Sequence, residues 1–181
     1  MNDVTSRYPT EDVEKPRIVI LISGSGSNML TIADQVLSGS IDADIAGVIC
    51  NEPEAAGVQK ARDRDLDVSV IDHRGFTSRE EFDVALMRTI DGYQPDLVVL
   101  AGFMRILTPD LVRRYEGRML NIHPSLLPKY QGLHTHRRAL EAGDDLHGVT
   151  VHFVTEVLDD GPNVIQAVVP VMDGDTEETL R

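Results

Sequence analysis

The chain has 181 residues, of which 41% are hydrophobic and 26% charged. These proportions suit one compact domain with a sizeable core and exclude a disordered or fibrous protein. Thirty acidic residues against seventeen basic ones give a net charge of −13, which disfavours a nucleic acid as partner. The single cysteine, Cys50, excludes an intramolecular disulfide, and we interpret it as a small buried residue.

The N-terminal segment differs from the rest of the chain. Residues 1–16 are polar, contain two prolines and lack the apolar core of a signal peptide. They predict a flexible N-terminal tail, followed by one domain over residues 17–181. Because no apolar run is long enough to span a bilayer, we expect a cytoplasmic protein with no membrane partner.

Apolar runs of strand length alternate with helical patterns along the domain. The predicted strands are 18–23, 45–50, 68–72, 97–102, 119–123, 149–155 and 164–171. The predicted helices cover 29–37, 55–64, 82–90, a short segment from Thr108 and Pro109, and 135–142. Such alternation indicates an α/β fold whose largely parallel sheet is covered on both faces. Ser78 and Glu81 have the spacing of a capping box.

A glycine-rich turn joins the first strand to the first helix. The segment Gly24 to Asn28 reads GSGSN, and exposed amides at a helix start can bind a phosphate. A dinucleotide site is disfavoured because position 29 is Met and Asn51 stands where a ribose-binding carboxylate is usual. A monophosphate is the better prediction. The alternative is a turn that serves packing alone.

Polar side chains follow two later strands. Asn121 and His123 are two residues apart, so both face one side of a strand end. Asn can donate to an oxyanion and His can transfer a proton, and neither role requires a metal. Asp159 and Asp160, in a turn between the last two strands, can return a carboxylate to the same edge. The alternatives are a structural Asn and His, and aspartates that only stabilise the turn.

The remaining histidines carry no metal motif. His134 and His136 are two apart at a helix start, which does not place them on one helical face. We therefore predict no structural metal site. His73, His147 and His152 are interpreted as ordinary surface or strand residues. The apolar loop 102–107 is able to wall a flat heteroaromatic ligand, or else it belongs to the core.

Four segments together carry a resemblance to a known family. ISGSGSN, LAGFMRIL, NIHPSLLPKYQGLHTH and VHFVTEVLDDGP occur in this order and resemble the phosphoribosylglycinamide formyltransferases, folate-dependent enzymes of purine synthesis. The resemblance implies a three-layer α/β/α formyltransferase-like fold. Its sheet would be mostly parallel and seven-stranded, with one antiparallel strand near the C-terminus. HPSLLP alone also resembles methionyl-tRNA formyltransferase and formyltetrahydrofolate deformylase.

The resemblance also implies roles for particular residues. The expected reaction transfers formyl from the co-substrate 10-formyltetrahydrofolate to glycinamide ribonucleotide without a metal. His123 would be the acid, Asn121 the oxyanion donor, and Asp159 the carboxylate that raises the pKa of His123. The substrate phosphate would contact Gly26, Ser27 and Asn28. The folate would contact Arg79, Met104, Arg105, Ile106, Leu107, Asn121, Thr155, Glu156, Val157, Leu158 and Asp159.

Three features depart from the family pattern. Asp160 stands where Gly is usual, and Gln131 where Pro is common. The chain stops at Arg181, where a C-terminal helix would begin, so we expect exposed apolar surface on the last strands and weakened binding of the amine substrate. A monomer or homodimer is expected. The competing hypotheses are a formyltetrahydrofolate deformylase and a non-catalytic folate- or nucleotide-binding module.

Overall fold

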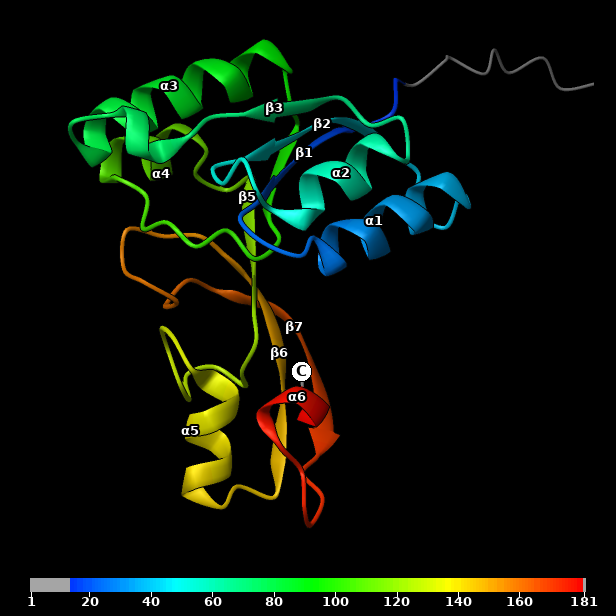
Figure 1. The fold of residues 1–181 in the computed structure, drawn as a ribbon, viewed down its shortest axis with the longest axis vertical. Helices are drawn as coiled ribbons and strands as arrows, with labels where there is room; N and C mark the ends of the chain where they lie inside the picture. The colour runs from blue at the N-terminus through cyan, green and yellow to red at the C-terminus, as the bar shows by residue number, and fades with distance from the viewer. Residues whose placement is uncertain (1–13, 181) are drawn as a thin grey trace, which may run out of the picture.

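A computed structural model describes residues 14–180, so most of the predicted N-terminal tail lies outside the described residues. Seven strands form one sheet in the order β3-β2-β1-β4-β5-β6-β7 (Figure 1). Strands β1 to β5 pair in parallel, and β6 runs antiparallel to both β5 and β7. The predicted mostly parallel sheet with one reversed strand is therefore confirmed.

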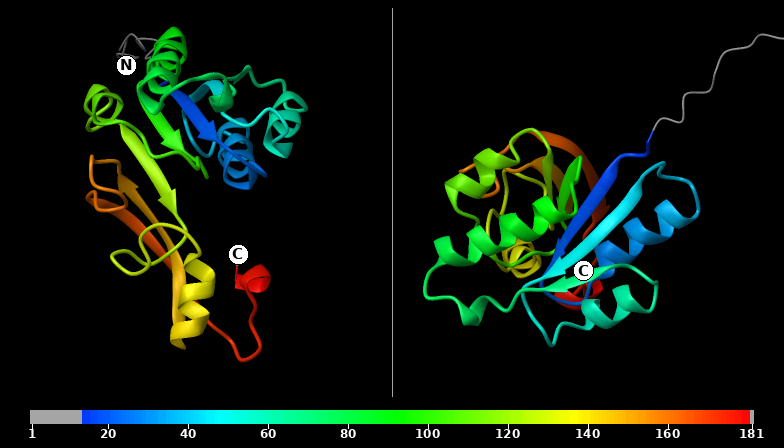
Figure 2. Two further views of the ribbon diagram at one scale, coloured as in Figure 1. Left: turned by 60° about the vertical axis from the view of Figure 1, so that its left-hand side comes forward. Right: turned by 90° about the horizontal axis from the view of Figure 1, so that it is seen from above.

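The first half of the chain forms the parallel, doubly covered part of the sheet. Its strands are β1 (Arg17–Ile22), β2 (Asp44–Cys50), β3 (Val68–Val70) and β4 (Leu97–Leu100). Its helices are α1 (Ser27–Leu37), α2 (Ala56–Arg62), α3 (Arg79–Gly92) and α4 (Pro109–Arg114), with a 3-10 turn at His73–Gly75. Helices α1 and α2 lie on one face, and α3 and α4 on the other (Figure 2).

The alternation of side chains along β1 explains the two faces. Ile20 and Ile22 pack with Met29 of α1 in one core cluster. Val19 and Leu21 pack in a second cluster with α3 and α4. Because side chains of a strand alternate between the two faces of a sheet, a continuous apolar run requires cover on both. The three-layer prediction is thus confirmed in this half.

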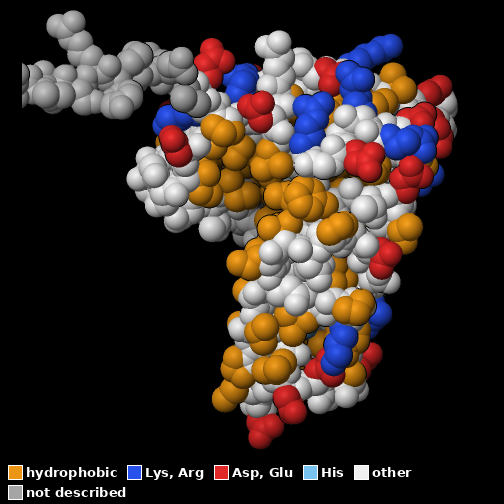
Figure 3. All heavy atoms as spheres, turned by 180° about the vertical axis from the view of Figure 1, so that it is seen from behind, with side chains coloured by type: hydrophobic (Ala, Val, Ile, Leu, Met, Phe, Trp, Pro, Cys, Tyr) orange, Lys and Arg blue, Asp and Glu red, His pale blue; other side chains and the backbone are white. Residues whose placement is uncertain are grey.

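The second half of the chain is less covered. It contains β5 (Met119–His123), α5 (Thr135–Ala142), β6 (Leu146–Phe153), β7 (Asn163–Pro170) and the short α6 (Glu177–Leu180). All eight residues of β7 are exposed, including Val164, Ile165 and Val168. Figure 3 shows many hydrophobic side chains on the narrower part of the molecule, which these elements build. The exposed apolar surface expected on the last strands is present.

Local differences from the sequence prediction have simple causes. Strand β6 begins and ends earlier than predicted, because it continues its pairing with β7 from Leu146. The side chain of Ser78 caps α3 by accepting from the Glu81 amide. The Glu81 carboxylate, however, accepts from the backbone and hydroxyl of Thr77 rather than completing the box on Ser78. Cys50 is fully buried as predicted, and burial raises the pKa of its thiol.

Candidate functional site

One large cleft of about 900 Å³ opens beyond the carboxyl ends of the central parallel strands. Strand β1 lies between β2 and β4. Helix α1, which follows β1, and helix α3, which precedes β4, cover opposite faces of the sheet, and open α/β sheets bind ligands at the point where the connections change sides in this way. The cleft is lined by the segments 23–28, 100–107, 121–124, 132–136, 147–149 and 154–159, among others. Segments distant in sequence therefore meet at one place.

The glycine-rich turn forms one end of this cleft. Gly26 is the residue before α1 and has a left-handed backbone, φ 71°. A Cβ there would lie 2.9 Å from Cα of Gly57, so packing against α2 demands glycine. Helix α1 carries no side-chain cap and no acidic residue in its first turn, and exposed Ser27 and Asn28 line the cleft. The turn thus serves packing and also presents a positive helix end to the cleft.

The apolar loop after β4 forms a second wall. Met104 and Ile106 are exposed apolar residues of this wall, and the Met104 amide donates to the Ser23 hydroxyl at 2.7 Å. At the far end of the loop, the buried carboxylate of Asp83 accepts from the Thr108 amide at 2.6 Å. Burial raises the pKa of Asp83. The loop is therefore anchored at both ends while its apolar side chains face the cleft.

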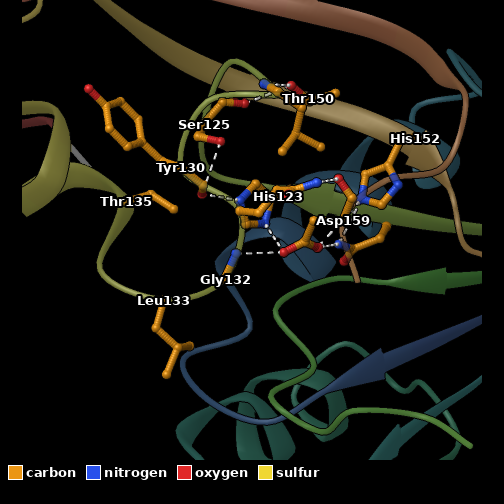
Figure 4. A network of polar contacts seen from close by, with 12 residues as sticks. His123, Ser125, Tyr130, Gly132, Leu133, Thr135, Thr150, His152 and Asp159 are labelled. Atoms are coloured by element: carbon orange, nitrogen blue, oxygen red, sulfur yellow. Dashed lines mark hydrogen bonds and ion pairs between the residues drawn. The ribbon is translucent and has the colours of Figure 1, made fainter. Parts of the chain in front are cut away.

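His123 and Asp159 lie together on the opposite wall (Figure 4). Their side chains are only 6% exposed, and Nδ1 of His123 is 3.4 Å from Oδ2 of Asp159. The other ring nitrogen, Nε2, donates to the Tyr130 carbonyl at 2.9 Å. Because that nitrogen already carries a proton, protonation at Nδ1 produces an imidazolium that faces a carboxylate. A buried acid of this kind is suited to proton transfer.

Asn121 is oriented by two further contacts. Its amide nitrogen donates to Nε2 of His152 at 3.1 Å and to Oδ1 of Asp159 at 3.4 Å. His152 donates from Nδ1 to the carbonyl of Phe153, which leaves Nε2 free to accept. Asn121 and His152 are register partners across the antiparallel pair β5 and β6. The amide of Asn121 is therefore held in one orientation beside His123.

The structure brings almost all predicted site residues to this cleft. The lining includes Gly26, Ser27, Asn28, Met104, Arg105, Ile106, Leu107, Asn121, His123, Thr155, Glu156, Val157, Leu158 and Asp159. Arg79 does not belong to it. Arg79 is the first residue of α3, where its side chain is exposed and lies 3.9 Å from Glu80.

Two histidines that we interpreted as ordinary residues belong to the site. His152 is 2% exposed and fixes Asn121; His147 is equally buried and lines the cleft. Burial lowers the pKa of His147. No sequence motif marks either residue. Only the register with β5 reveals that 152 faces Asn121.

Residues 14–180 contain neither a metal-binding cluster nor a membrane-spanning helix. Among these described residues, no group of three or more His, Cys, Asp or Glu is placed to hold a metal ion. In the same part of the chain, no helix has the length and apolar character needed to cross a membrane.

Comparisons with known proteins point to one family. A family model described as formyl transferase matches residues 16–181. The chain is 52% identical over 163 residues to a phosphoribosylglycinamide formyltransferase of Escherichia coli, covering 90% of this chain and 77% of that protein. It is 45% identical over 168 residues to a trifunctional purine biosynthetic protein of Drosophila melanogaster, covering 92% of this chain and 12% of that protein.

A solved structure agrees with these matches. The glycinamide ribonucleotide transformylase 1 of Symbiobacterium toebii superimposes with a TM-score of 0.89 at 44% identity. The match covers 92% of this chain and 78% of that one. At this level of identity, the likeness extends to the sequence as well as to the fold.

Proposed function

Because the chain belongs to the formyl transferase family, we propose that it transfers a formyl group from 10-formyltetrahydrofolate to the amine of glycinamide ribonucleotide, a step of purine biosynthesis. The observation that carries this proposal is the buried pair of His123 and Asp159 beside Asn121. This pair lies on one wall of a cleft that also contains the uncapped N-terminus of α1.

The reaction needs no nucleophile from the protein. The substrate amine attacks the formyl carbon, a C–N bond forms, and a tetrahedral intermediate carries a developing oxyanion. When the bond to N10 of the folate breaks, that nitrogen gains a proton from an acid of the protein, and the proton that the amine loses returns to the same group. We assign the proton donor as His123, whose Nδ1 lies 3.4 Å from the carboxylate of Asp159.

Asn121 is proposed as the oxyanion donor. Of the two hydrogens on its amide nitrogen, the one shared with Asp159 is held at 3.4 Å and the one shared with His152 at 3.1 Å. The longer contact is the weaker one. The hydrogen directed towards Asp159 is therefore the one that can more readily be shared with a developing charge.

The two ends of the cleft suit the two substrates. We propose that Gly26, Ser27 and Asn28 hold the phosphate, since the first turn of α1 offers amides without competing acidic side chains. We propose that the folate lies between the apolar loop 104–107 and the segment 155–159, both of which line the cleft. Arg79 is left out of this proposal because it lies outside the lining.

One assay separates this function from its competitors. Release of tetrahydrofolate from the formyl donor is measured with and without glycinamide ribonucleotide. We expect release only with the amine, with formylated amine formed in equal amount. Release without the amine would indicate a deformylase. Binding of both ligands with no release in either case would indicate a binding module.

A further inference from the structure

A segment of three consecutive residues forms hydrogen bonds with both members of the His123 and Asp159 pair. The segment consists of Tyr130, Gln131 and Gly132. The Tyr130 carbonyl accepts from Nε2 of His123 at 2.9 Å. The Gly132 amide donates to Oδ2 of Asp159 at 2.8 Å. Between them, the side-chain amide of Gln131 donates to the carbonyl of Asp159 at 3.1 Å. Figure 4 shows the first two of these contacts.

The turn that carries Asp159 needs such support. Asp159 has a left-handed backbone, φ 51°, which costs energy in a residue with a side chain. The same Gln131 amide also donates to the carboxylate of the next residue, Asp160, at 3.4 Å. One amide group thus uses both of its hydrogens to fix the main chain of 159 and the side chain of 160.

Gln131 is itself firmly placed. The main-chain carbonyl of Gln131 accepts from Nη1 of Arg138 at 2.6 Å. The Arg138 guanidinium lies over the Tyr130 ring, 5.2 Å from its centre. The Tyr130 hydroxyl in turn donates to Asp144 at 2.8 Å. The segment 130–132 is therefore tied to α5 and to the loop that follows α5.

We infer that Gln131 is a positioning residue for the proposed reaction: through its bridge to Asp159 and Asp160, it sets the distance between Asp159 and His123. This inference rests on the proposed function. Gln131 and Asp160, the two departures from the family pattern singled out in the sequence, act in this view as one pair. The bridge joins two exposed residues, neither of which lines the cleft.

The test is a double-mutant cycle with Gln131→Ala, Asp160→Ala and the double variant. We expect Gln131→Ala to lower kcat about three- to tenfold, the effect of losing one positioning hydrogen bond. KM for both substrates should stay within about twofold. The double variant should be no slower than Gln131→Ala alone. Asp160→Asn, which keeps an acceptor oxygen, should retain the wild-type kcat.

Gln35→Ala serves as the matched control, because Gln35 is an exposed glutamine on α1 away from the cleft. A second readout is amide hydrogen exchange in the segment 154–162, which we expect to accelerate in Gln131→Ala and not in the control. An unchanged kcat and unchanged exchange would overturn the inference, as would a rise in KM alone or additive effects in the cycle. An inactive wild type with accelerated exchange in Gln131→Ala would refute the proposed function while retaining the bridge.

Discussion

Strands β1 and β7 are held in the same sheet in different ways. Five consecutive residues of β1 are buried, with helices over both faces. Strand β7 pairs with β6 along nearly its whole length, yet all of its residues are exposed. Burial of apolar area stabilises the first strand, whereas backbone hydrogen bonds account for most of what holds the second. The chain thus combines a deeply packed half with a half that is packed on fewer sides.

The polar chemistry belongs to the less packed half. His123, Asp159, Asn121 and His152 all come from β5 onwards, while the parallel half contributes a helix end and an apolar wall. The comparison teaches that the proposed binding surfaces and the proposed reacting groups are divided between the two halves.

The largest effect is expected from the reacting groups. Replacing His123 by Ala should lower kcat by about 10²- to 10⁴-fold, since a positioned acid contributes this much. Asp159→Asn should also lower kcat, because the imidazolium loses its carboxylate partner at 3.4 Å. Steady-state rates of formyl transfer measure both. Near wild-type rates in both variants would move the chemistry to the parallel half.

Substitutions on β1 and β7 should differ in how much they lower the free energy of unfolding. Leu21→Ala on β1 removes a fully buried side chain and should lower the free energy of unfolding by about 2–5 kcal/mol. Val168→Ala on β7, where the side chain is 54% exposed, should change it by less than about 1 kcal/mol. Urea denaturation with a common slope gives both values. Equal losses would mean that β7 is as well packed as β1.

A substitution in the glycine-rich turn should weaken both the stability of the protein and the binding of the substrate. Gly26→Ala places a Cβ 2.9 Å from the backbone of Gly57 and keeps a φ of 71°, at a cost of about 1–2 kcal/mol for the backbone conformation alone. We expect a lower Tm and a higher KM for glycinamide ribonucleotide, with KM for the folate little changed. Gly39→Ala, also left-handed but with open space around it, is the control for the backbone effect. An unchanged KM for glycinamide ribonucleotide would mean that the turn has a role in packing and none in binding this substrate.

The smallest effect concerns pH. Burial raises the folded-state pKa of Asp83 above the ordinary value of about 3.9, so the folded protein binds a proton more readily than the unfolded chain there. The penalty for the charged form is therefore present above the folded pKa, and it is relieved as the pH falls through that pKa towards about 4. Compared with Asp83→Asn, the wild type should gain stability over this interval. The measurement is the free energy of unfolding as a function of pH for both proteins. Parallel curves would contradict a raised pKa at Asp83.

Sequence reasoning reached most of the site because short patterns marked it. The continuous apolar run of β1 and its glycine turn identified the parallel sheet and one end of the cleft. The spacing of Asn121 and His123 put both on one side of β5. His152 lies in a strand as interpreted, but its contact with Asn121 was missed, because that contact depends on the register of an antiparallel pair, which no local pattern encodes. Arg79 was placed by resemblance, and it is not among the residues that line the cleft.

The bridge of Gln131 escaped prediction for a related reason. The sequence identified positions 131 and 160 as departures from the family pattern. The two positions are far apart along the chain, and nothing in the sequence around one indicates that it contacts the other. Their contact exists only because the segment 130–132 and the turn after β6 meet over His123. The predictions of a monomer or homodimer and of weakened binding of the amine substrate remain predictions.

The position of Asp159 between the last two strands has a consequence for how the protein acquires its structure. Strand β1 pairs with β2 and β4, so the phosphate turn and the apolar wall can form from the first 118 residues during synthesis. The carboxylate reaches His123 only after β6 has reversed direction and the chain has turned back. Because distant contacts form late, we expect a nascent chain to form the proposed phosphate site before the proposed proton donor is held in place.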